Sequence, residues 1–416
     1  MRVAIITHAF PPSNHANGKR PSYLVEALLE QGWAVDVFTT ELGCEGPVTE
    51  SMTHPHLTVR REVDLVVNGF QKLKRFPALH RIAVSLLAGL MWPDFYALWS
   101  RRVAKLLSDA KPYDRVICFV FPPSIYLAAK KKGLIDGNWV FDLQESVTPQ
   151  YLIAPRRSPL QKRWQPKLGE LEKRALGQAG GVVYTAQTNR EAYIDQELVS
   201  AQKTTHIPYF YDSGVFDGRK SEIPDLFEIR YFGTFDWSGS RSPKTFLTSL
   251  AGFLKRNPEA RNRTQFTFYG NWLSEHNEIL KELDLEDVVK IYSAVSYQKY
   301  LELVSASPVL LLVISSEHNL FMPSKIVDYF GANRPILAYV PRGSEMRNVL
   351  QKAGMSEQTI DDSDVSGGIQ AIESLWQSFS SNQLNSMDSS TEQWSSEVQL
   401  PRYVELLKGL PVGVGS

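Results

Sequence analysis

The chain has 416 residues, enough for two domains of ordinary size, and its 43% hydrophobic and 22% charged residues are typical of a soluble globular protein. Lysine plus arginine and aspartate plus glutamate both total 45, so the formal net charge is zero, which argues against a dedicated nucleic-acid binder. The two cysteines, Cys44 and Cys118, argue against a disulfide framework, and without clustered histidines they make a poor zinc site.

The N-terminal stretch before Pro11 is too short for a signal peptide, and no apolar run approaches the ~20 residues that span a bilayer. We therefore expect a cytoplasmic protein.

Short β-branched runs alternate with helical patterns, which predicts parallel α/β sheets. The first series of predicted strands is Arg2–Thr7, Ala34–Thr40, Leu57–Val63, Tyr113–Val120, Asn138–Gln144 and Gly181–Ala186, with helices at Arg20–Gly32 and Pro166–Gly177. The second series is Glu228–Phe235, Gln265–Gly270, Val289–Ala294, Val309–Ser315 and Pro335–Val340, with helices near Ser242–Arg256, Tyr297–Ser305 and Ser324–Ala332. Two doubly wound sheets in tandem explain this pattern better than one sheet of all these strands.

Turn-forming residues in His206–Pro224 predict a linker, and a polar stretch after Asp361 predicts a loop. A last helical pattern covers Val398–Leu407. We predict domains at residues 1–210 and 220–385, with a helix at 390–410 that returns to the first domain.

The first segment suited to chemistry is the loop after the first strand, in which Gly18 precedes a helix that begins near Pro21. Helix N-termini at the carboxyl edge of a parallel sheet attract anions, and a glycine lets a phosphate approach the backbone. The alternative is an ordinary connecting loop, because the three-glycine dinucleotide fingerprint is absent.

The second segment opens the second domain. Its strand reaches Thr234, Arg241 is predicted to stand just before a helix, and Lys244 is predicted to lie one turn into that helix. A guanidinium there suits a pyrophosphate, although two solvated surface cations would give the same pattern.

The third segment is MPSKIVDYFGAN. Ser324 is a candidate N-cap, Lys325 adds charge at the helix start, and Asp328 is placed to accept hydrogen bonds from ribose hydroxyls. For Asp328 the alternative is simple complementarity to the helix dipole.

The fourth segment is DLQES, where a predicted strand ends in Asp142, Gln144 and Glu145. These side chains are candidates for acceptor binding or general-base catalysis. Capping of the following helix is the alternative.

Together these segments resemble bacterial family 4 glycosyltransferases along nearly the whole chain. FPPSNHANGKR resembles the family's N-terminal glycine loop, and DLQES resembles its first-domain active-site segment. FGTFDWSGSRSPKTFL, VSYQKYLELVSASPVLLLV and MPSKIVDYFGANRPILA resemble its donor-binding domain. The resemblance implies the GT-B fold, with two Rossmann-like domains facing across a deep cleft.

By this similarity the chain would transfer a sugar, with retention of configuration, from a nucleotide-diphosphate sugar to a cell-surface glycan or lipid-linked acceptor. The donor-binding residues would be Gly18, Gly233, Arg241, Lys244, Ser324, Lys325 and Asp328. His15, Arg20 and Gln144 would lie on the acceptor side, and Glu145 and Asp142 are the catalytic candidates. No acidic pair stands at a strand end to bind a metal, so we expect neither a metal nor any cofactor beyond the nucleotide-sugar co-substrate.

Two positions depart from the family pattern. Leu320 stands where the family has a glutamate, with Glu317 nearby but out of register, and Thr234 replaces a frequent arginine. The family's catalytic histidine has no match, and His8 and His15 have the character of loop histidines. These departures motivate an alternative, a catalytically silent paralogue that serves as a partner subunit; a sugar-nucleotide epimerase is a third, weaker alternative.

The apolar run Ile82–Trp92 is too short to span a bilayer. Its basic neighbours make it suitable for an anionic membrane surface, and a buried core helix is the alternative. Those neighbours are Lys72, Lys74, Arg75, Arg81, Arg101 and Arg102.

Overall fold

The computed structural model describes residues 1–13, 15–41, 51–63, 69, 75–76, 92–131, 133–149, 159–216, 225–235, 242–315, 319–384 and 389–411. It divides into two compact units. Unit 1 comprises Met1–Pro208 together with Leu400–Ser416, and unit 2 comprises Tyr209–Gln399. Within the described ranges no helix combines the length and hydrophobicity needed to cross a lipid bilayer.

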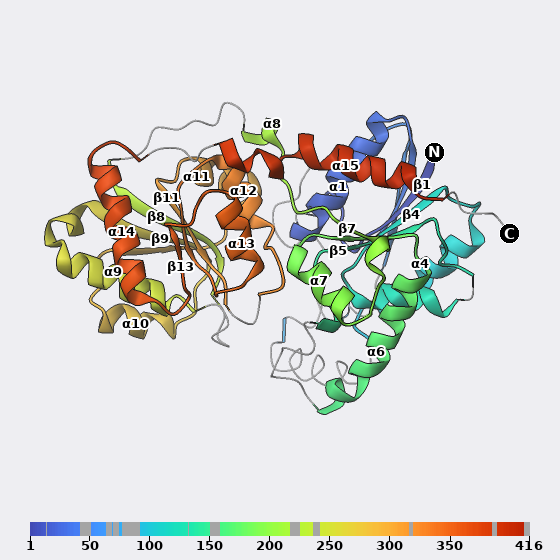
Figure 1. Ribbon diagram of the computed structural model, residues 1–416, viewed down its shortest axis with the longest axis horizontal. Coiled ribbons are helices and arrows are strands. Elements are labelled where there is room, and N and C mark those ends of the chain that lie inside the picture. The colour runs from blue at the N-terminus through green and yellow to red at the C-terminus, as the bar shows by residue number, and fades with distance from the viewer. Residues whose placement is uncertain are drawn as a thin grey trace. The chain divides into compact units, whose positions relative to one another are not determined.

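Unit 1 is built on a seven-stranded sheet in the order β3-β2-β1-β4-β5-β6-β7, in which neighbouring strands run parallel (Figure 1). The strands are β1 (Arg2–Ile6), β2 (Ala34–Thr40), β3 (Leu57–Glu62), β4 (Arg115–Phe119), β5 (Trp139–Leu143), β6 (Gly181–Tyr184) and β7 (Thr204–His206). The helices are α1 (Lys19–Glu30), α4 (Ala97–Asp109), α6 (Pro159–Gln178), α7 (Gln187–Asp195) and α15 (Ser396–Gly409), with 3-10 turns η1 (Ala16–Gly18), η2 (Pro123–Lys130) and η3 (Ala201–Lys203).

Helices cover both faces of this sheet. Side chains alternate along β1, so Val3 and Ile5 pack in one cluster with α1 and α15, whereas Ala4 and Ile6 pack in another with α4, α6 and η2. A strand buried on both faces is apolar at nearly every position, and such apolar runs are the sequence pattern that predicted a parallel sheet.

Unit 2 has a six-stranded sheet, in the order β10-β9-β8-β11-β12-β13 and again with parallel neighbours. The strands are β8 (Phe227–Thr234), β9 (Thr264–Asn271), β10 (Val289–Tyr292), β11 (Val309–Val313), β12 (Ile336–Tyr339) and β13 (Thr359–Ile360). The helices are α8 (Ser213–Phe216), α9 (Lys244–Arg256), α10 (His276–Glu282), α11 (Tyr297–Ser305), α12 (Lys325–Ala332), α13 (Glu345–Lys352) and α14 (Val365–Ser380), with 3-10 turns η4 (Pro258–Arg263) and η6 (Ser389–Trp394).

The core of unit 2 is rich in aromatic side chains. Phe227, Ile229 and Tyr231 of β8 pack against α9 and α14 on one face of the sheet. The next residue, Phe232, points to the other face, where its ring centroid lies 5.0 Å from that of Tyr300 on α11. Both units are therefore doubly wound, and the predicted α/β fold class is confirmed.

Candidate functional site

In a doubly wound sheet, ligands bind outside the carboxyl ends of the strands, at the point where the strand order reverses. That point lies between β1 and β4 in unit 1 and between β8 and β11 in unit 2. The loops that follow these strands carry most of the predicted site residues, so each unit is described in turn.

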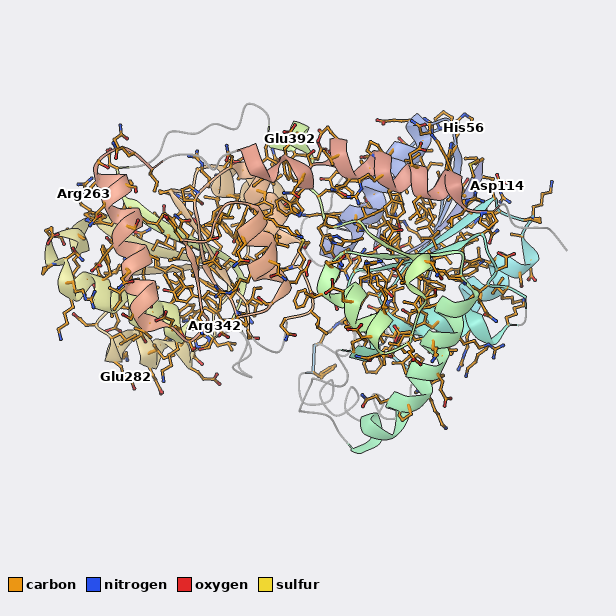
Figure 2. All side chains as sticks on the ribbon, in the orientation of Figure 1. His56, Asp114, Arg263, Glu282, Arg342 and Glu392 are labelled. Carbon is orange, nitrogen blue, oxygen red and sulfur yellow. The ribbon has the colours of Figure 1, made fainter. Side chains whose placement is uncertain are left out.

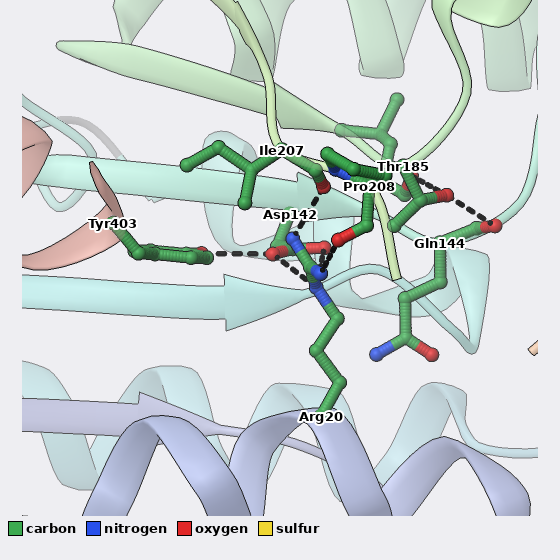
Figure 3. A network of polar contacts seen from close by, with 8 residues as sticks. Arg20, Asp142, Gln144, Thr185, Ile207, Pro208 and Tyr403 are labelled. Carbon is green, nitrogen blue, oxygen red and sulfur yellow. Dashed lines mark hydrogen bonds and ion pairs between the residues drawn. The ribbon is translucent and has the colours of Figure 1, made fainter. Parts of the chain in front are cut away.

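In unit 1 the centre of this edge is a buried ion pair between Arg20 and Asp142 (Figure 3). Arg20 Nε donates to the two carboxylate oxygens of Asp142 over 3.2 and 2.9 Å. Its Nη1 and Nη2 donate to the carbonyls of Pro208 and Ile207 over 2.7 and 2.9 Å. Tyr403 of α15 donates its hydroxyl to Asp142 Oδ2 over 2.9 Å.

The Arg20–Asp142 pair is inaccessible to solvent. The side chains of Arg20 and Asp142 are 2% and 0% exposed. Burial raises the pKa of Asp142 above its usual range, and the charge and hydrogen bonds of Arg20 and the bond from Tyr403 act against that rise. This geometry favours a structural role for both side chains over the base and acceptor contacts expected of them, because both are already engaged within unit 1.

The exposed carboxylate of the DLQES segment is Glu145. Gln144 is 2% exposed, and its backbone carbonyl accepts a hydrogen bond from Thr185 Oγ1 over 3.2 Å (Figure 3). Glu145, the next residue, is the only exposed side chain between Asp142 and Pro149. Of the two catalytic candidates, only Glu145 can therefore meet a substrate in this structure.

Gly18 lies in the turn that leads into α1, where a Cβ atom would approach the backbone of Ala9 to 3.4 Å. Its amide donates to the carbonyl of His15 over 2.9 Å. The loop after β1 thus folds back on itself, with Gly18 at ordinary van der Waals distance from Ala9.

His8, expected from the sequence to have the character of a loop histidine, follows the same strand. It is 2% exposed, and its ring centroid lies 5.1 Å from His15, 5.9 Å from Tyr96 and 5.0 Å from Phe121. Burial, and after it the neighbouring His15, lowers the pKa of His8 to about 3, and burial also lowers the pKa of His15. An uncharged histidine pair therefore stands at the carboxyl end of β1; burial of this kind has no signature in a loop sequence.

In unit 2 the ends of β8 and β9 come together through two glycines. Gly233 and Gly270 are register partners, with φ angles of 141° and 147°. A Cβ atom on Gly270 would lie 1.8 Å from the carbonyl oxygen of Gly233. Only glycine fits this approach.

Lys325, at the start of α12, places its ammonium group against the end of β8. Its Nζ donates to the carbonyl of Phe232 over 3.0 Å and lies 4.4 Å from the ring centroid of Tyr231. A Cβ atom on Gly233 would come within 3.2 Å of the same nitrogen. Gly233 and Lys325, predicted separately, are therefore brought together as a fixed cation beside the reversal point of the sheet.

The prediction for Ser324 needs a correction. It stands at the N-cap of α12, but its backbone is helical and its side chain accepts no hydrogen bond from the helix. A capping hydroxyl requires extended backbone at that position, which this turn does not have. The C-terminal stop is as predicted, with Asn333 in the left-handed conformation at φ 52°.

Asp328 is 7% exposed in the first turn of α12. Burial, followed by the charge of Asp328, raises the pKa of Tyr300 on α11 well above its usual value. Asp328 thus has a polar neighbour inside unit 2 itself, and its proposed contact with a ribose stays a prediction.

The remaining donor-side residues fall at the start of α9 or outside the described ranges. Lys244 is exposed and is the first residue of α9 rather than one turn into it. Arg241 and Glu317 lie outside the described residues. Leu320 is half-buried and Thr234 is exposed at the end of β8. Among the side chains that the structure describes, no three of histidine, cysteine, aspartate or glutamate gather as metal ligands.

No protein-family model matches the chain, and no curated protein matches its sequence. Solved structures do match at nearly full length. A trehalose-6-phosphate structure from E. coli bound with UDP-2-fluoro glucose has 14% identity and TM-score 0.63, covering 99% of this chain and 100% of that one. Sucrose-phosphate synthase from Thermosynechococcus elongatus has 16% identity and TM-score 0.63, covering 98% of each chain. WaaG, a glycosyltransferase involved in lipopolysaccharide biosynthesis, has 12% identity and TM-score 0.61, covering 98% of this chain and 100% of that one. The chain therefore has the GT-B fold.

Proposed function

We propose that the chain is a glycosyltransferase that transfers a sugar from a nucleotide-diphosphate sugar to an acceptor hydroxyl. The observation that carries this proposal is the fixed ammonium of Lys325 at the end of β8, held over 3.0 Å by the carbonyl of Phe232. A cation held by protein contacts before substrate arrives stabilises a leaving diphosphate at no reorganisation cost. The UDP-2-fluoro glucose bound in the E. coli neighbour supports a nucleotide-sugar donor.

In the proposed reaction the bond between the anomeric carbon and the phosphate oxygen breaks, and a bond to the acceptor oxygen forms on the same face. Lys325, Arg241 and Lys244 bind the diphosphate, with Ser324 and Gly18 beside it, and Asp328 binds the ribose. The acceptor proton passes to the departing phosphate oxygen, or to Glu145 as the exposed carboxylate of unit 1. His15 and Gln144 line the acceptor side. No metal takes part, because the cations stabilise the leaving group.

The test of this proposal is calorimetric titration with UDP, GDP and ADP. Lys325→Met should weaken the best-binding nucleotide about 10- to 150-fold, the range for a hydrogen bond to a charged group. Lys352→Met, which removes an exposed lysine at the end of α13, is the matched control. Equal nucleotide affinity in the two variants would contradict the donor-site assignment.

A second candidate is a catalytically silent GT-B paralogue acting as a partner subunit. Leu320 and Thr234, where the related family carries charged residues, favour it. Release of nucleoside diphosphate from a panel of nucleotide sugars separates the two, because a silent subunit would bind without turnover.

We further propose a family 4 enzyme of polysaccharide biosynthesis that works at the cytoplasmic face of a membrane on a glycan or lipid-linked acceptor. The support is a set of exposed cations, namely Arg75, Arg101 and Arg102, which flank the apolar run in the sequence, and Lys130, whose Nζ lies 4.5 Å from the Trp92 ring centroid. The apolar residues before Trp92 lie outside the described ranges. Flotation with anionic liposomes that high salt abolishes would support this proposal; flotation equal with neutral and anionic lipid would contradict it.

A further inference from the structure

A buried carboxylate that no predicted motif includes lies beneath the loop after β5. Glu172, in α6, is 0% exposed. Its Oε1 accepts hydrogen bonds from the hydroxyls of Tyr126 and Tyr193 over 2.9 and 2.7 Å. Its Oε2 accepts from the amide of Thr148 over 3.1 Å and from the Thr148 hydroxyl.

Tyr193 extends this network to the next residue of the loop. Its hydroxyl oxygen accepts the amide of Val147 over 3.0 Å while its proton is donated to Glu172. The amides of two successive loop residues, Val147 and Thr148, are therefore held by one cluster of side chains. Burial and the charge of Glu172 raise the pKa of both Tyr126 and Tyr193 well above the usual value, so both phenols stay protonated and donate.

The other end of the loop is also fixed. Thr185 Oγ1 lies 3.4 and 3.2 Å from the carbonyls of Leu143 and Gln144, and Asp142 is paired with Arg20. Between the two fixed ends stands Glu145, the exposed side chain of the segment.

We propose that Glu172 and Tyr193 are positioning residues, which hold the loop of residues 144–148 so that Glu145 faces the acceptor in a fixed place. This inference rests on the proposed function. Packing alone gives no reason for a carboxylate at position 172, because taking a carboxylate out of water costs free energy that only its hydrogen bonds offset. Two of the four donors that offset it belong to the loop residue Thr148.

Two tyrosine variants give a matched comparison. Tyr193→Phe and Tyr126→Phe both delete one phenol, both side chains are 0% exposed, and both phenols donate to Oε1 of Glu172. Only the phenol of Tyr193 also accepts a loop amide.

Hydrogen exchange of the peptide covering residues 144–149 in the full chain is the first measurement. Tyr193→Phe should speed exchange at Val147 and Thr148 about five-fold or more, the loss of one net hydrogen bond, whereas Tyr126→Phe should leave it within about two-fold. Equal exchange in both variants would overturn the proposal.

Turnover of the best nucleotide sugar and acceptor in the panel is the second measurement. Tyr193→Phe should lower kcat/KM for the acceptor about ten-fold with an unchanged KM for the donor, because neither Tyr193 nor the loop of residues 144–148 is among the proposed donor-binding residues. Equal losses in both tyrosine variants, or a raised donor KM, would refute the positioning role. Absence of turnover with every donor would refute the proposed function instead, and the exchange comparison would then decide whether the cluster holds the loop.

Discussion

Acidification should destabilise unit 1 through His8. The folded chain holds the pKa of His8 at about 3, while in the unfolded chain it returns to about 6.5. A base whose pKa is lowered by folding binds its proton only after unfolding, so stability is lost as the pH falls from about 6.5 towards 3. At pH 5 the linkage amounts to about 2 kcal/mol, since each pKa unit corresponds to about 1.36 kcal/mol.

The measurement is urea unfolding of the wild type and of His8→Gln at pH 7.5 and pH 5.0. From pH 7.5 to pH 5.0, the free energy of unfolding should fall by about 2 kcal/mol more in the wild type than in His8→Gln. The two proteins must be compared because Asp142 and Glu172, whose pKa values burial raises, stabilise the fold as the pH falls. Their contribution opposes that of His8 and is the same in the wild type and in His8→Gln. His56→Gln, at an exposed site before β3 (Figure 2), should behave as the wild type does. An equal pH dependence in wild type and His8→Gln would refute the reasoning.

Two further predictions concern stability. Arg20→Met should cost about 3–5 kcal/mol in urea unfolding because it leaves Asp142 buried without its counter-charge, and adding Asp142→Leu should recover part of that loss; additive losses would contradict the pairing. Gly270→Ala should cost about 3 kcal/mol, since its Cβ would lie 1.8 Å from a backbone oxygen. The control Gly343→Ala, with φ 71° and open space around the site, should cost about 1–2 kcal/mol; equal thermal shifts would show that the clash is relieved elsewhere.

The sequence predicted the long strands of both sheets and missed the short ones. β1 and β11 contain the apolar runs VAII and VLLLV, and β8 has apolar residues at alternating positions, Phe227, Ile229 and Tyr231; both patterns predict strands. β7 and β13 have three and two residues, too few for any periodicity, and they pair only because a neighbouring strand presents an open edge.

The sequence suggested individual candidate residues for a site, but it carried no signal for the contacts that the structure shows between them. Lys325 and Gly233 were both expected on the donor side, yet their approach depends on a backbone angle of 141° that no residue type reveals. Asp142 was expected to be a base because strand-end carboxylates often are. The structure pairs it with Arg20, 122 positions away, and with Tyr403, 261 positions away, and separations of that size leave no local signal in the sequence.

A chain is synthesised from its N-terminus, so α15 is made after the other helices and strands of both units. Unit 2 is one continuous stretch, Tyr209–Gln399, whereas unit 1 is completed only by the residues from Leu400 onward. Until those residues emerge, Asp142 lacks the hydroxyl of Tyr403, and Arg115, which is 1% exposed in the finished unit, lacks the carbonyls of Leu407 and Leu410. Unit 1 therefore keeps these polar groups unsatisfied until α15 has been synthesised, after every residue of unit 2. A chaperone that binds exposed, half-formed α/β surface would thus hold unit 1 longest, although it is made first.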